Sequence, residues 1–203
     1  DLLYVGTDGN GVHFISTKQG KVVRSFQHEV GKGGSLRSNS VYSLLVDRDG
    51  LIWVGFYQLG LDYTLYQSEL FHTYSYPPYF DTKDMPVRTI TFRGSEKLIG
   101  SRDGLYFIDE QRGRYAGFSA PQLRSSMIIC SYAFQGKYYI GTYGGGMYVL
   151  DPVTLTISDF EPHVVQPFVK GQIFCIKSDM EGCLWIGTSV GLFRYKDGRM
   201  LNH

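Results

Sequence analysis

The stretch that decides the fold reads Leu184-Trp-Ile-Gly-Thr-Ser-Val-Gly-Leu-Phe193, because versions of it recur along the chain. A second clear copy runs from Ile52 to Leu61, and weaker copies begin at Leu3, Leu98 and Tyr139. Copies recur at intervals of roughly 40 to 50 residues and are built from short apolar strands, which is typical of β-propeller blades. Each copy has an anchor glycine after an apolar pair: Gly6, Gly55, Gly100, Gly141 and Gly187.

Composition agrees with an all-β fold rich in tight turns. The 203 residues include 16 Tyr, 13 Phe and 25 Gly, and 19% are charged. Aromatic residues suit pleated surfaces, and glycine supplies the positive φ that hairpins need. The formal net charge is +1 and no Lys/Arg run is present. The chain therefore lacks the electrostatic footprint of a protein that binds nucleic acid or an anionic membrane surface.

One blade can be followed in full between residues 41 and 75. Strands are predicted at 41–46, 51–55, 61–66 and 71–74, the first of them buried on both sides as the innermost strand. Asp47-Arg-Asp-Gly50 predicts a tight turn between the first two. Shorter two-residue turns are predicted within Arg93-Gly-Ser-Glu96 and Phe134-Gln-Gly-Lys137.

The last copy predicts strands at 173–176, 184–187 and 192–195, and we expect that blade to lack its outer strand. The predicted fold class is therefore all-β, with blades made of four-stranded antiparallel sheets. Residues 1–203 are interpreted as a single β-propeller fragment, a partial propeller of about four to five blades. Both ends are expected to be truncated from a longer chain.

Motifs for catalysis or metal binding are not evident. The three cysteines, Cys130, Cys175 and Cys183, have neither disulfide-framework nor metal spacing, and the first two are expected to be small buried thiols. The five histidines share no metal-ligand spacing. Asp47-x-x-Gly50 and Asp179-x-x-Gly182 are interpreted as turns rather than calcium loops. We therefore expect no catalytic residue, no metal and no cofactor in this segment.

The two tryptophans admit two interpretations. Trp53 and Trp185 precede an anchor glycine by two positions, where other copies have Tyr4, Leu98 and Tyr139. A tryptophan ring can be a stacking platform for a sugar or a base. It can also fill space between blades, with the glycine admitting a neighbour's side chain. The varied residues at this position favour packing.

Written out as a repeat, the sequence has an apolar strand, Asp-x-x-Gly, Leu-Trp-Ile-Gly-Thr and then Gly-Leu-(Phe/Tyr)-x-Tyr. This pattern resembles the two-component regulator propeller repeats in the periplasmic sensor region of bacterial hybrid two-component systems, especially of the Bacteroides type. Residues 173–195 fit best, and residues 41–63 fit well until Phe56 and Asp62. Residues 87–109 depart most, with Leu98 for Trp and Ser101 for Thr.

The resemblance implies a ligand-sensing extracytoplasmic input module of a hybrid sensor histidine kinase, which regulates transcription in response to oligosaccharides. It implies a periplasmic location, in the ectodomain of an inner-membrane protein. The implied partners are an oligosaccharide or other small ligand, and a second copy or the remaining blades of the same chain. Contact with nucleic acid or directly with the membrane is not expected of this segment.

Candidate ligand-binding residues follow from where a propeller places its loops. The connectors 28–40, 76–86, 119–127 and 161–172 should emerge on the same face as the turns between second and third strands. Sugar sites combine aromatic faces with planar hydrogen-bonding groups. The candidates on this face are Arg37, Asn39, Tyr76, Tyr79, Asp81, Arg88, Arg102, Asp103, Tyr143, His163 and Gln166.

Two other functions stay open. Each candidate residue is also consistent with an ordinary exposed loop residue, in which case the propeller serves as a scaffold for protein–protein contact or receptor dimerisation without its own ligand. A propeller lyase or hydrolase would need clustered histidines, acids or a metal, and the scattered histidines disfavour it.

Overall fold

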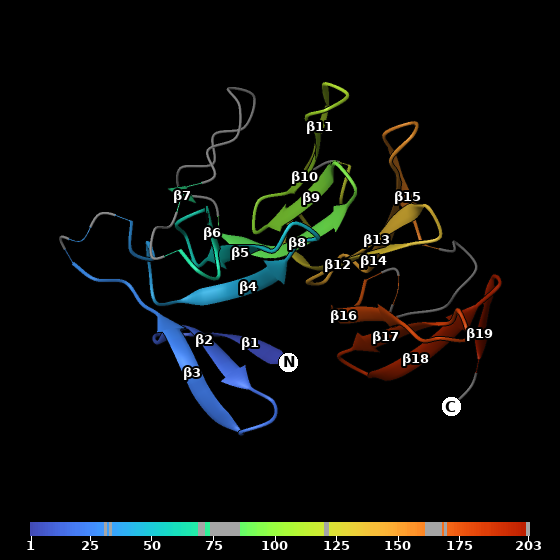
Figure 1. Cartoon of the computed structure of the whole chain (residues 1–203). Coiled ribbons are helices and arrows are strands. Elements are labelled where there is room, and N and C mark those ends of the chain that lie inside the picture. Colours follow the sequence, from blue (N-terminus) through green and yellow to red (C-terminus); the bar gives the residue numbers. More distant parts are fainter. Residues whose placement is uncertain are drawn as a thin grey trace. The chain divides into compact units, whose positions relative to one another are not determined.

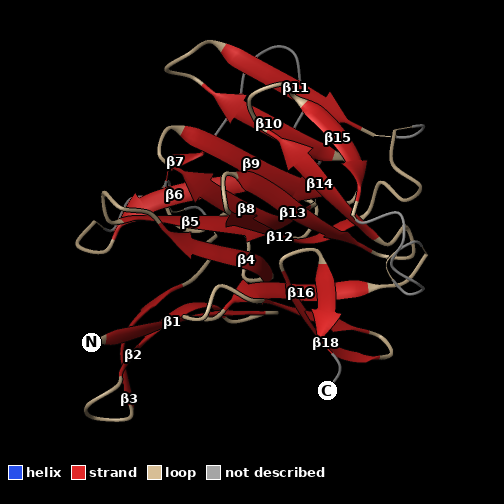
Figure 2. Cartoon of the chain, turned by 90° about the vertical axis from the view of Figure 1, so that its right-hand side faces the viewer, coloured by secondary structure: helices blue, strands red, loops and turns tan. Residues whose placement is uncertain are grey.

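The computed structural model shows a chain built from β-strands and turns (Figure 1). It describes residues 1–30, 32, 34–68, 72–73, 86–119, 122–160, 168 and 170–201. Within these ranges there are nineteen strands and no helix (Figure 2), so no described helix is available to cross a lipid bilayer. The strands form five sheets in which successive strands pair, and the all-β prediction is confirmed.

Chain order and sheet order coincide, as in propeller blades. The first sheet has three strands and each of the others has four. The first sheet consists of β1 (Leu2–Thr7), β2 (Gly11–Ser16) and β3 (Lys21–Phe26). The second sheet consists of β4 (Val41–Val46), β5 (Leu51–Phe56), β6 (Leu61–Leu65) and β7 (His72–Thr73). The third sheet has β8 (Val87–Arg93), β9 (Glu96–Ser101), β10 (Leu105–Asp109) and β11 (Arg114–Phe118). The fourth sheet has β12 (Ile128–Phe134), β13 (Lys137–Thr142), β14 (Met147–Asp151) and β15 (Thr156–Asp159). The fifth has β16 (Ile173–Ser178), β17 (Leu184–Thr188), β18 (Gly191–Lys196) and β19 (Arg199–Leu201).

The blade predicted between residues 41 and 75 is confirmed as β4–β7. The expectation that the last blade lacks an outer strand is wrong, because β19 follows β18 through a two-residue turn. Asp197 and Gly198 both have positive φ, 47° and 78°, which is the geometry of a tight hairpin turn. The sequence signal for this strand was the Asp-Gly pair itself.

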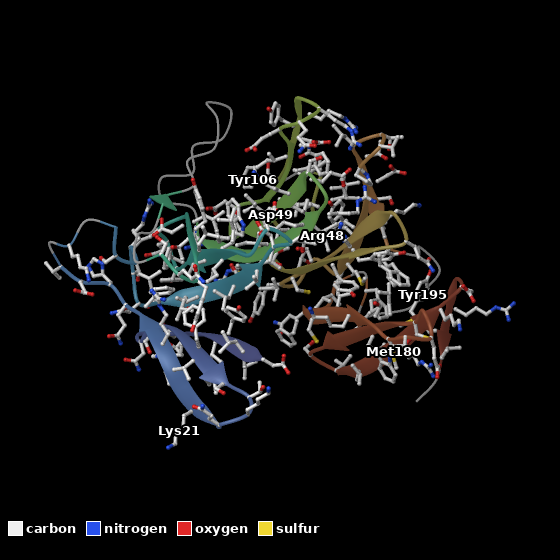
Figure 3. All side chains as sticks on the ribbon, in the orientation of Figure 1. Lys21, Arg48, Asp49, Tyr106, Met180 and Tyr195 are labelled. Atoms are coloured by element: carbon white, nitrogen blue, oxygen red, sulfur yellow. The ribbon has the colours of Figure 1, made fainter. Side chains whose placement is uncertain are left out.

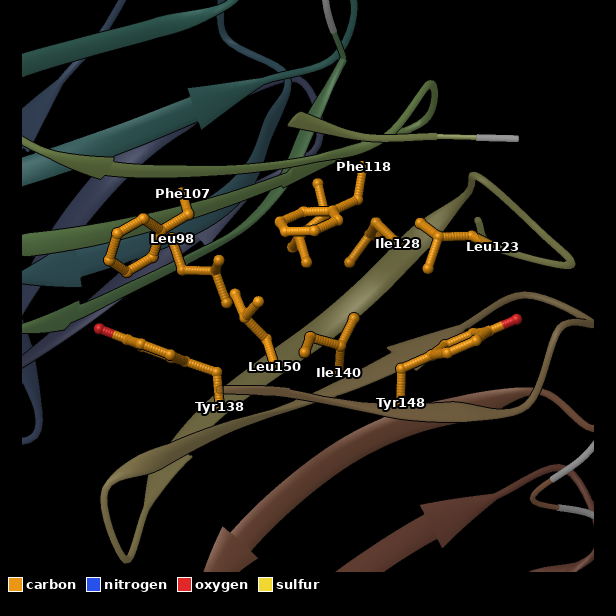
Figure 4. Close-up of a cluster of buried hydrophobic side chains, with 10 residues drawn as sticks. Leu98, Phe107, Phe118, Leu123, Ile128, Tyr138, Ile140, Tyr148 and Leu150 are labelled. Atoms are coloured by element: carbon orange, nitrogen blue, oxygen red, sulfur yellow. The ribbon is translucent and has the colours of Figure 1, made fainter. Parts of the chain in front are cut away.

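Two compact units make up the chain, Asp1–Ile90 and Thr91–His203. The first unit has a core of eight buried residues contributed by the first two sheets and the connector between them: Val12, Phe14, Phe26, Leu36, Val41, Ile52, Val54 and Phe56. The second unit has two such clusters. Figure 4 shows one of them, in which the rings of Tyr138 and Tyr148 close the two ends with their hydroxyls turned outward. Those hydroxyls meet Glu96 Oε2 at 2.9 Å and the backbone N–H of Arg124 at 2.6 Å.

The anchor glycines make room for the neighbouring sheet. A Cβ built on Gly6 would lie 2.6 Å from Val41 Cγ1, and one on Gly141 would lie 2.6 Å from Ile173 Cγ2. Gly55 has the same relation to Val87, at 2.8 Å. In all three cases the inserted residue is β-branched and is the first residue of the next inner strand. The prediction that glycine admits a neighbour's side chain is confirmed at these positions.

The tryptophans are fixed by the turns that precede them. In the β4–β5 turn, Asp47 Oδ1 accepts the backbone N–H groups of Asp49 and Leu51, and its Oδ2 accepts Trp53 Nε1 at 2.7 Å. Asp179 and Trp185 repeat this arrangement in the β16–β17 turn, also at 2.7 Å. We call each arrangement an Asp–Trp clamp. The clamps identify Asp-x-x-Gly as turn chemistry, as predicted, and assign the indoles a structural role.

The side chains around each clamp differ. Trp53 stacks on Tyr63 at 5.0 Å between ring centroids, whereas the guanidinium of Arg194 lies 5.4 Å over Trp185. Arg48, Asp49 and Met180, labelled in Figure 3, belong to the two turns that the clamps close. Backbone N–H bonds, above all from Cys183, and the Trp185 indole hold the pKa of Asp179 below its usual range.

Substituting alanine for two anchor glycines tests the packing rule. Gly141→Ala should destabilise the second unit by about 1–3 kcal/mol, because the new methyl overlaps Ile173 of the adjacent sheet. Gly187→Ala is the matched control, since the side chain within reach there is the thiol of Cys175 in its own sheet, on an exposed position where it can rotate away. Urea unfolding measures both. Equal losses of unfolding free energy in the two variants would show that the side chain from the neighbouring sheet does not limit the space at Gly141.

The clamp at Asp179 should be sensitive to acid. A carboxylate with a lowered folded pKa stabilises the fold above its unfolded pKa of about 4, and this contribution disappears as the pH falls through the folded value. Asp179→Ala should therefore lower the unfolding free energy at pH 7, and the gap to the wild type should close in strong acid. Trp185→Phe, which removes one hydrogen bond, should cost about 1 kcal/mol at pH 7. A gap between Asp179→Ala and wild type that is constant from pH 7 to pH 2 would contradict the clamp.

Candidate functional site

Backbone hydrogen bonds bring connectors and turns together on one face within each unit. In the first unit Ser40, at the end of a connector, forms a bridge with Asp8, and Tyr57 N–H donates to Ser40 O at 3.2 Å. In the second unit Gln172 forms a bridge with Tyr143, and Ser189 N–H donates to its carbonyl at 3.1 Å. Both units thus place a connector end beside two turns, those after β1 and β5 in the first unit and those after β13 and β17 in the second. We call this the loop face of each unit.

Threonine and serine hydroxyls shape the turns of the loop face. Thr142 Oγ1 donates to Gly146 O at 2.8 Å and accepts the N–H of Gly145 at 3.0 Å. Ser101, which replaces threonine in the repeat, makes the same kind of bonds with Gly104. The hydroxyl after the anchor glycine therefore closes the turn, and the serine substitution preserves its chemistry.

Two predicted site residues of the first unit are used to hold the loop face together. The Arg37 guanidinium lies 3.3 Å from the Asp62 carboxylate and donates to Leu59 O at 2.9 Å. Asp62 is 2% exposed, so this ion pair is partly buried. The side chain of Asn39 accepts the backbone N–H of His28 at 2.7 Å. Arg37 and Asn39 thus position the loops whether or not they also contact a ligand.

The predicted residues of the second unit are more open. Arg102 and Asp103 are exposed on the β9–β10 turn, and Tyr143 is 49% exposed on the β13–β14 turn. The backbone of Tyr143 is fixed on both sides, since its N–H donates to Met127 O and its carbonyl accepts the Ser125 hydroxyl. A fixed backbone that carries a half-exposed aromatic ring is suited to ligand contact.

A cluster in the first unit joins one predicted residue, Arg88, to two tyrosines that sequence reasoning missed. The rings of Tyr42 and Tyr57 stack at 5.1 Å with an interplanar angle of 24°, and the Arg88 guanidinium lies 5.4 Å over Tyr42. Tyr57 stands two residues after its anchor glycine, as Arg102 and Tyr143 do. This shared spacing was the sequence signal from which Tyr57 could have been predicted as a site residue.

Tyr42 corrects an expectation. The strand that contains it was predicted to be buried on both sides, yet Tyr42 is 40% exposed and Val41 is the fully buried member of the strand. The physical reason is that Val41 inserts against Gly6, and the register then shifts between Val41 and Ser43, which makes Tyr42 the extra residue of a β-bulge.

The other predicted site residues lie outside the described residues and stay predictions. They are Tyr76, Tyr79, Asp81, His163 and Gln166.

A group of three potential metal ligands does not fit a cation. The ligand atoms of Asp179, Glu181 and Cys183 lie within 4.8 Å of one another. However, the Arg194 guanidinium contacts Glu181 and lies 3.5 Å from Asp179 Oδ2, and the Asp179 carboxylate already accepts bonds from its turn and from Trp185. A positive charge at this position opposes binding of a second one.

Of the two cysteines expected to be buried, Cys130 is half-buried and Cys175 is exposed. Burial raises the pKa of Cys130 to about 12, which makes it an inert thiol. Cys175 is exposed, contrary to expectation, because it lies opposite Gly187 on the sheet face directed away from the core formed by Ile173 and Ile176.

The first unit also has a surface pocket of about 450 Å³ beside β3, lined by Arg24, Ser25, Phe26, Gln27, Glu29, Lys32 and Ser35. The charged side chains of this lining are held by contacts within the protein. Glu29 pairs with Lys32 at 2.9 Å, and Arg24 donates to Ser68 O and covers the rings of Phe26 and Tyr66.

Two arginine substitutions separate structural from exposed site residues. Arg37→Leu should lower the unfolding free energy of the first unit by about 1–3 kcal/mol, because it removes the ion pair between the guanidinium and the buried Asp62 carboxylate. Arg102→Leu removes an exposed arginine from the equivalent face and should change stability by less than about 0.5 kcal/mol. Chemical unfolding of each purified variant measures the difference. A neutral Arg37→Leu would show that the Asp62 pair does not hold the loop.

One family model of known proteins matches two short segments of the chain. A model of the two-component regulator propeller matches residues 35–58 and 167–190, two segments that each contain one Asp–Trp clamp. No curated protein matches the sequence.

Solved structures share the fold. The extracellular domain of BT3049 from B. thetaiotaomicron, assigned as a hybrid two-component system, superposes with a TM-score of 0.74 at 21% identity over 99% of this chain. That of BT4673, from the same organism and with a similar assignment, gives 0.68 at 20% identity over 98%. The β-propeller domain of Cps50 from Myceliophteria thermophila gives 0.68 at 12% identity over 99% of this chain and 69% of its own. This chain spans 28% of the BT3049 domain and 26% of the BT4673 domain.

Proposed function

We propose that this chain of two-component regulator propeller repeats is the ligand-sensing input module of an extracytoplasmic receptor, and that its ligand is an oligosaccharide. The observation that carries the proposal is the loop face. Rigid turns with fixed backbones present half-exposed tyrosines, Tyr57 in the first unit and Tyr143 in the second. The family match supports a place in two-component signalling.

The rest of the signalling chain belongs to the same proposal. By analogy with the extracellular domains that it resembles, the module lies in the periplasm as part of an inner-membrane protein. A histidine kinase and a transcriptional output would belong to other segments. Residues 1–203 would then be one piece of a single propeller, and the piece itself non-catalytic.

Oligosaccharide suits the chemistry of the loop face. Tyrosine rings offer flat apolar surfaces to the C–H faces of a pyranose, and their hydroxyls bond to sugar hydroxyls. Arg102 and Asp103, on the β9–β10 turn of the second unit, add planar hydrogen-bonding groups. In such a receptor, ligand acts by binding one arrangement of the receptor more tightly than another, because a ligand shifts an equilibrium only through differential affinity.

A second function is favoured by the sheet that ends the chain. Gly187 has the same position as the anchor glycines that accept Val41, Val87 and Ile173, yet the side chain within reach of it is Cys175 of its own sheet. Leu192, paired with Gly187, is 57% exposed. This face suits a Val or Ile that opens an inner strand of another blade, from a second copy or from other blades of the receptor. On this alternative the module is an assembly scaffold.

One experiment separates the two functions. Thermal unfolding is measured with neutral and acidic di- to tetrasaccharides from plant, host and microbial glycans, and sedimentation is measured in parallel. A ligand at one hundred times its Kd should stabilise the fold by about 2.7 kcal/mol. The sensing proposal expects such a shift for one glycan class, reduced by Tyr143→Ala or Tyr57→Ala.

Leu192→Glu is the matched control, because it should disrupt self-association and leave sugar binding intact. If the chain forms a concentration-dependent dimer that Leu192→Glu abolishes, and no glycan raises the unfolding temperature, the assembly function would stand in place of the sensing function.

A further inference from the structure

An arginine with an unsatisfied donor lies over an exposed tyrosine of the first unit, and a second exposed tyrosine stacks on the first. We propose that Tyr42, Tyr57 and Arg88 form a subsite for an acidic sugar, a pyranose that carries a carboxylate. This inference rests on the proposed function and adds the charge class of the ligand.

Arg88 differs from the other arginines of the described chain. Arg37, Arg93, Arg112, Arg124 and Arg194 each pair with a carboxylate, and Arg24 and Arg114 each donate to a backbone carbonyl. Arg48, Arg102 and Arg199 are exposed and hydrated. Within the described ranges, Arg88 is the arginine that is partly buried and makes no hydrogen bond or ion pair.

The Arg88 Nε–H is buried and has no hydrogen-bond partner. A buried donor without a partner is unfavourable, so native structures rarely retain one without a use. Contact with the Tyr42 ring compensates the charge in part but supplies no acceptor. A carboxylate would supply acceptors in the planar geometry that a guanidinium matches.

The tyrosines define what else the ligand has. Both rings are 40% exposed, and they stack on each other rather than on the core. Each ring covers one face of the other, and the apolar surface that the pair leaves open to solvent lies next to a cation. A hexuronic acid presents both complementary features, an apolar C–H face and a carboxylate at the ring's edge.

The scaffold keeps the three side chains in place. Val87, which precedes Arg88, is the residue that inserts against Gly55, and Gly55 precedes Tyr57 by two positions. The backbone N–H of Tyr57 is bonded to Ser40 O, two residues before Tyr42. The subsite is therefore assembled by the same contacts that pack the sheets, and ligand binding requires little further ordering.

The test compares uronic-acid oligosaccharides with their carboxyl-reduced forms, which keep the sugar ring and lose the charge. Titration calorimetry is performed with di- to tetrasaccharides of galacturonate, glucuronate and iduronate, each against its reduced counterpart. One acidic probe should bind about tenfold or more tightly than its reduced form, since a hydrogen bond to a charged group contributes about 1.5–3 kcal/mol. Its affinity should fall as salt is raised.

Three variants assign the effect to the subsite. Arg88→Gln should abolish the preference for the acidic probe and leave the affinity for the reduced form unchanged. Tyr57→Ala should weaken both forms. Arg48→Gln, which removes an exposed arginine of the same unit, should change neither, and the unfolding curve of each variant confirms that it is folded.

The outcomes separate this inference from the proposed function. Equal affinity for acidic and reduced probes, or an acidic preference that persists in Arg88→Gln, would overturn the acidic subsite while sugar sensing stands. Tighter binding of neutral glycans alone would do the same. Absence of binding by every acidic and neutral probe would overturn both.

Discussion

Much of this structure depends on a steric contact between a glycine and a β-branched side chain. Val41, Val87 and Ile173 each open an inner strand and each occupy space that a Cβ on Gly6, Gly55 or Gly141 would need. Because interiors are close-packed, a contact at this distance sets how closely one sheet approaches the next. The opposing residue in the glycine's own sheet is small as well, Ser43 beside Gly55 and Cys130 beside Gly141. Cys130 and Cys175 thus lie in inner strands for a steric reason, because each is a small residue opposite an anchor glycine.

The recurring sequence predicted the sheets well because each blade repeats the same local rules. An apolar strand, an Asp-x-x-Gly turn and an anchor glycine are read from neighbouring residues, and the strands between residues 41 and 75 appear where these rules place them. The short outer strand β19 was not predicted, because three residues are too few to show alternation. The Asp197-Gly198 pair nevertheless indicates the hairpin turn that precedes it.

The candidate site was less accessible to sequence reasoning. Its pairs join residues that lie far apart in the chain, such as Arg37 with Asp62, and charge alone does not reveal which arginine is already paired. Exposure was also misjudged at Tyr42 and Cys175, since an apolar strand gives no sign of which face another sheet covers. What the sequence did supply was the register of the turns, which is why Tyr57, Arg102 and Tyr143 occupy equivalent positions after their glycines.

The two Asp–Trp clamps have a practical consequence for spectroscopy. The chain contains two tryptophans, and one lies in each compact unit, Trp53 in the first and Trp185 in the second. Both indoles donate to an aspartate at the same distance, but one stacks on a tyrosine and the other lies beneath a guanidinium. Each unit therefore carries its own intrinsic fluorophore in a distinct environment. Emission from a single-tryptophan version of the chain would report on one unit at a time, without any added label.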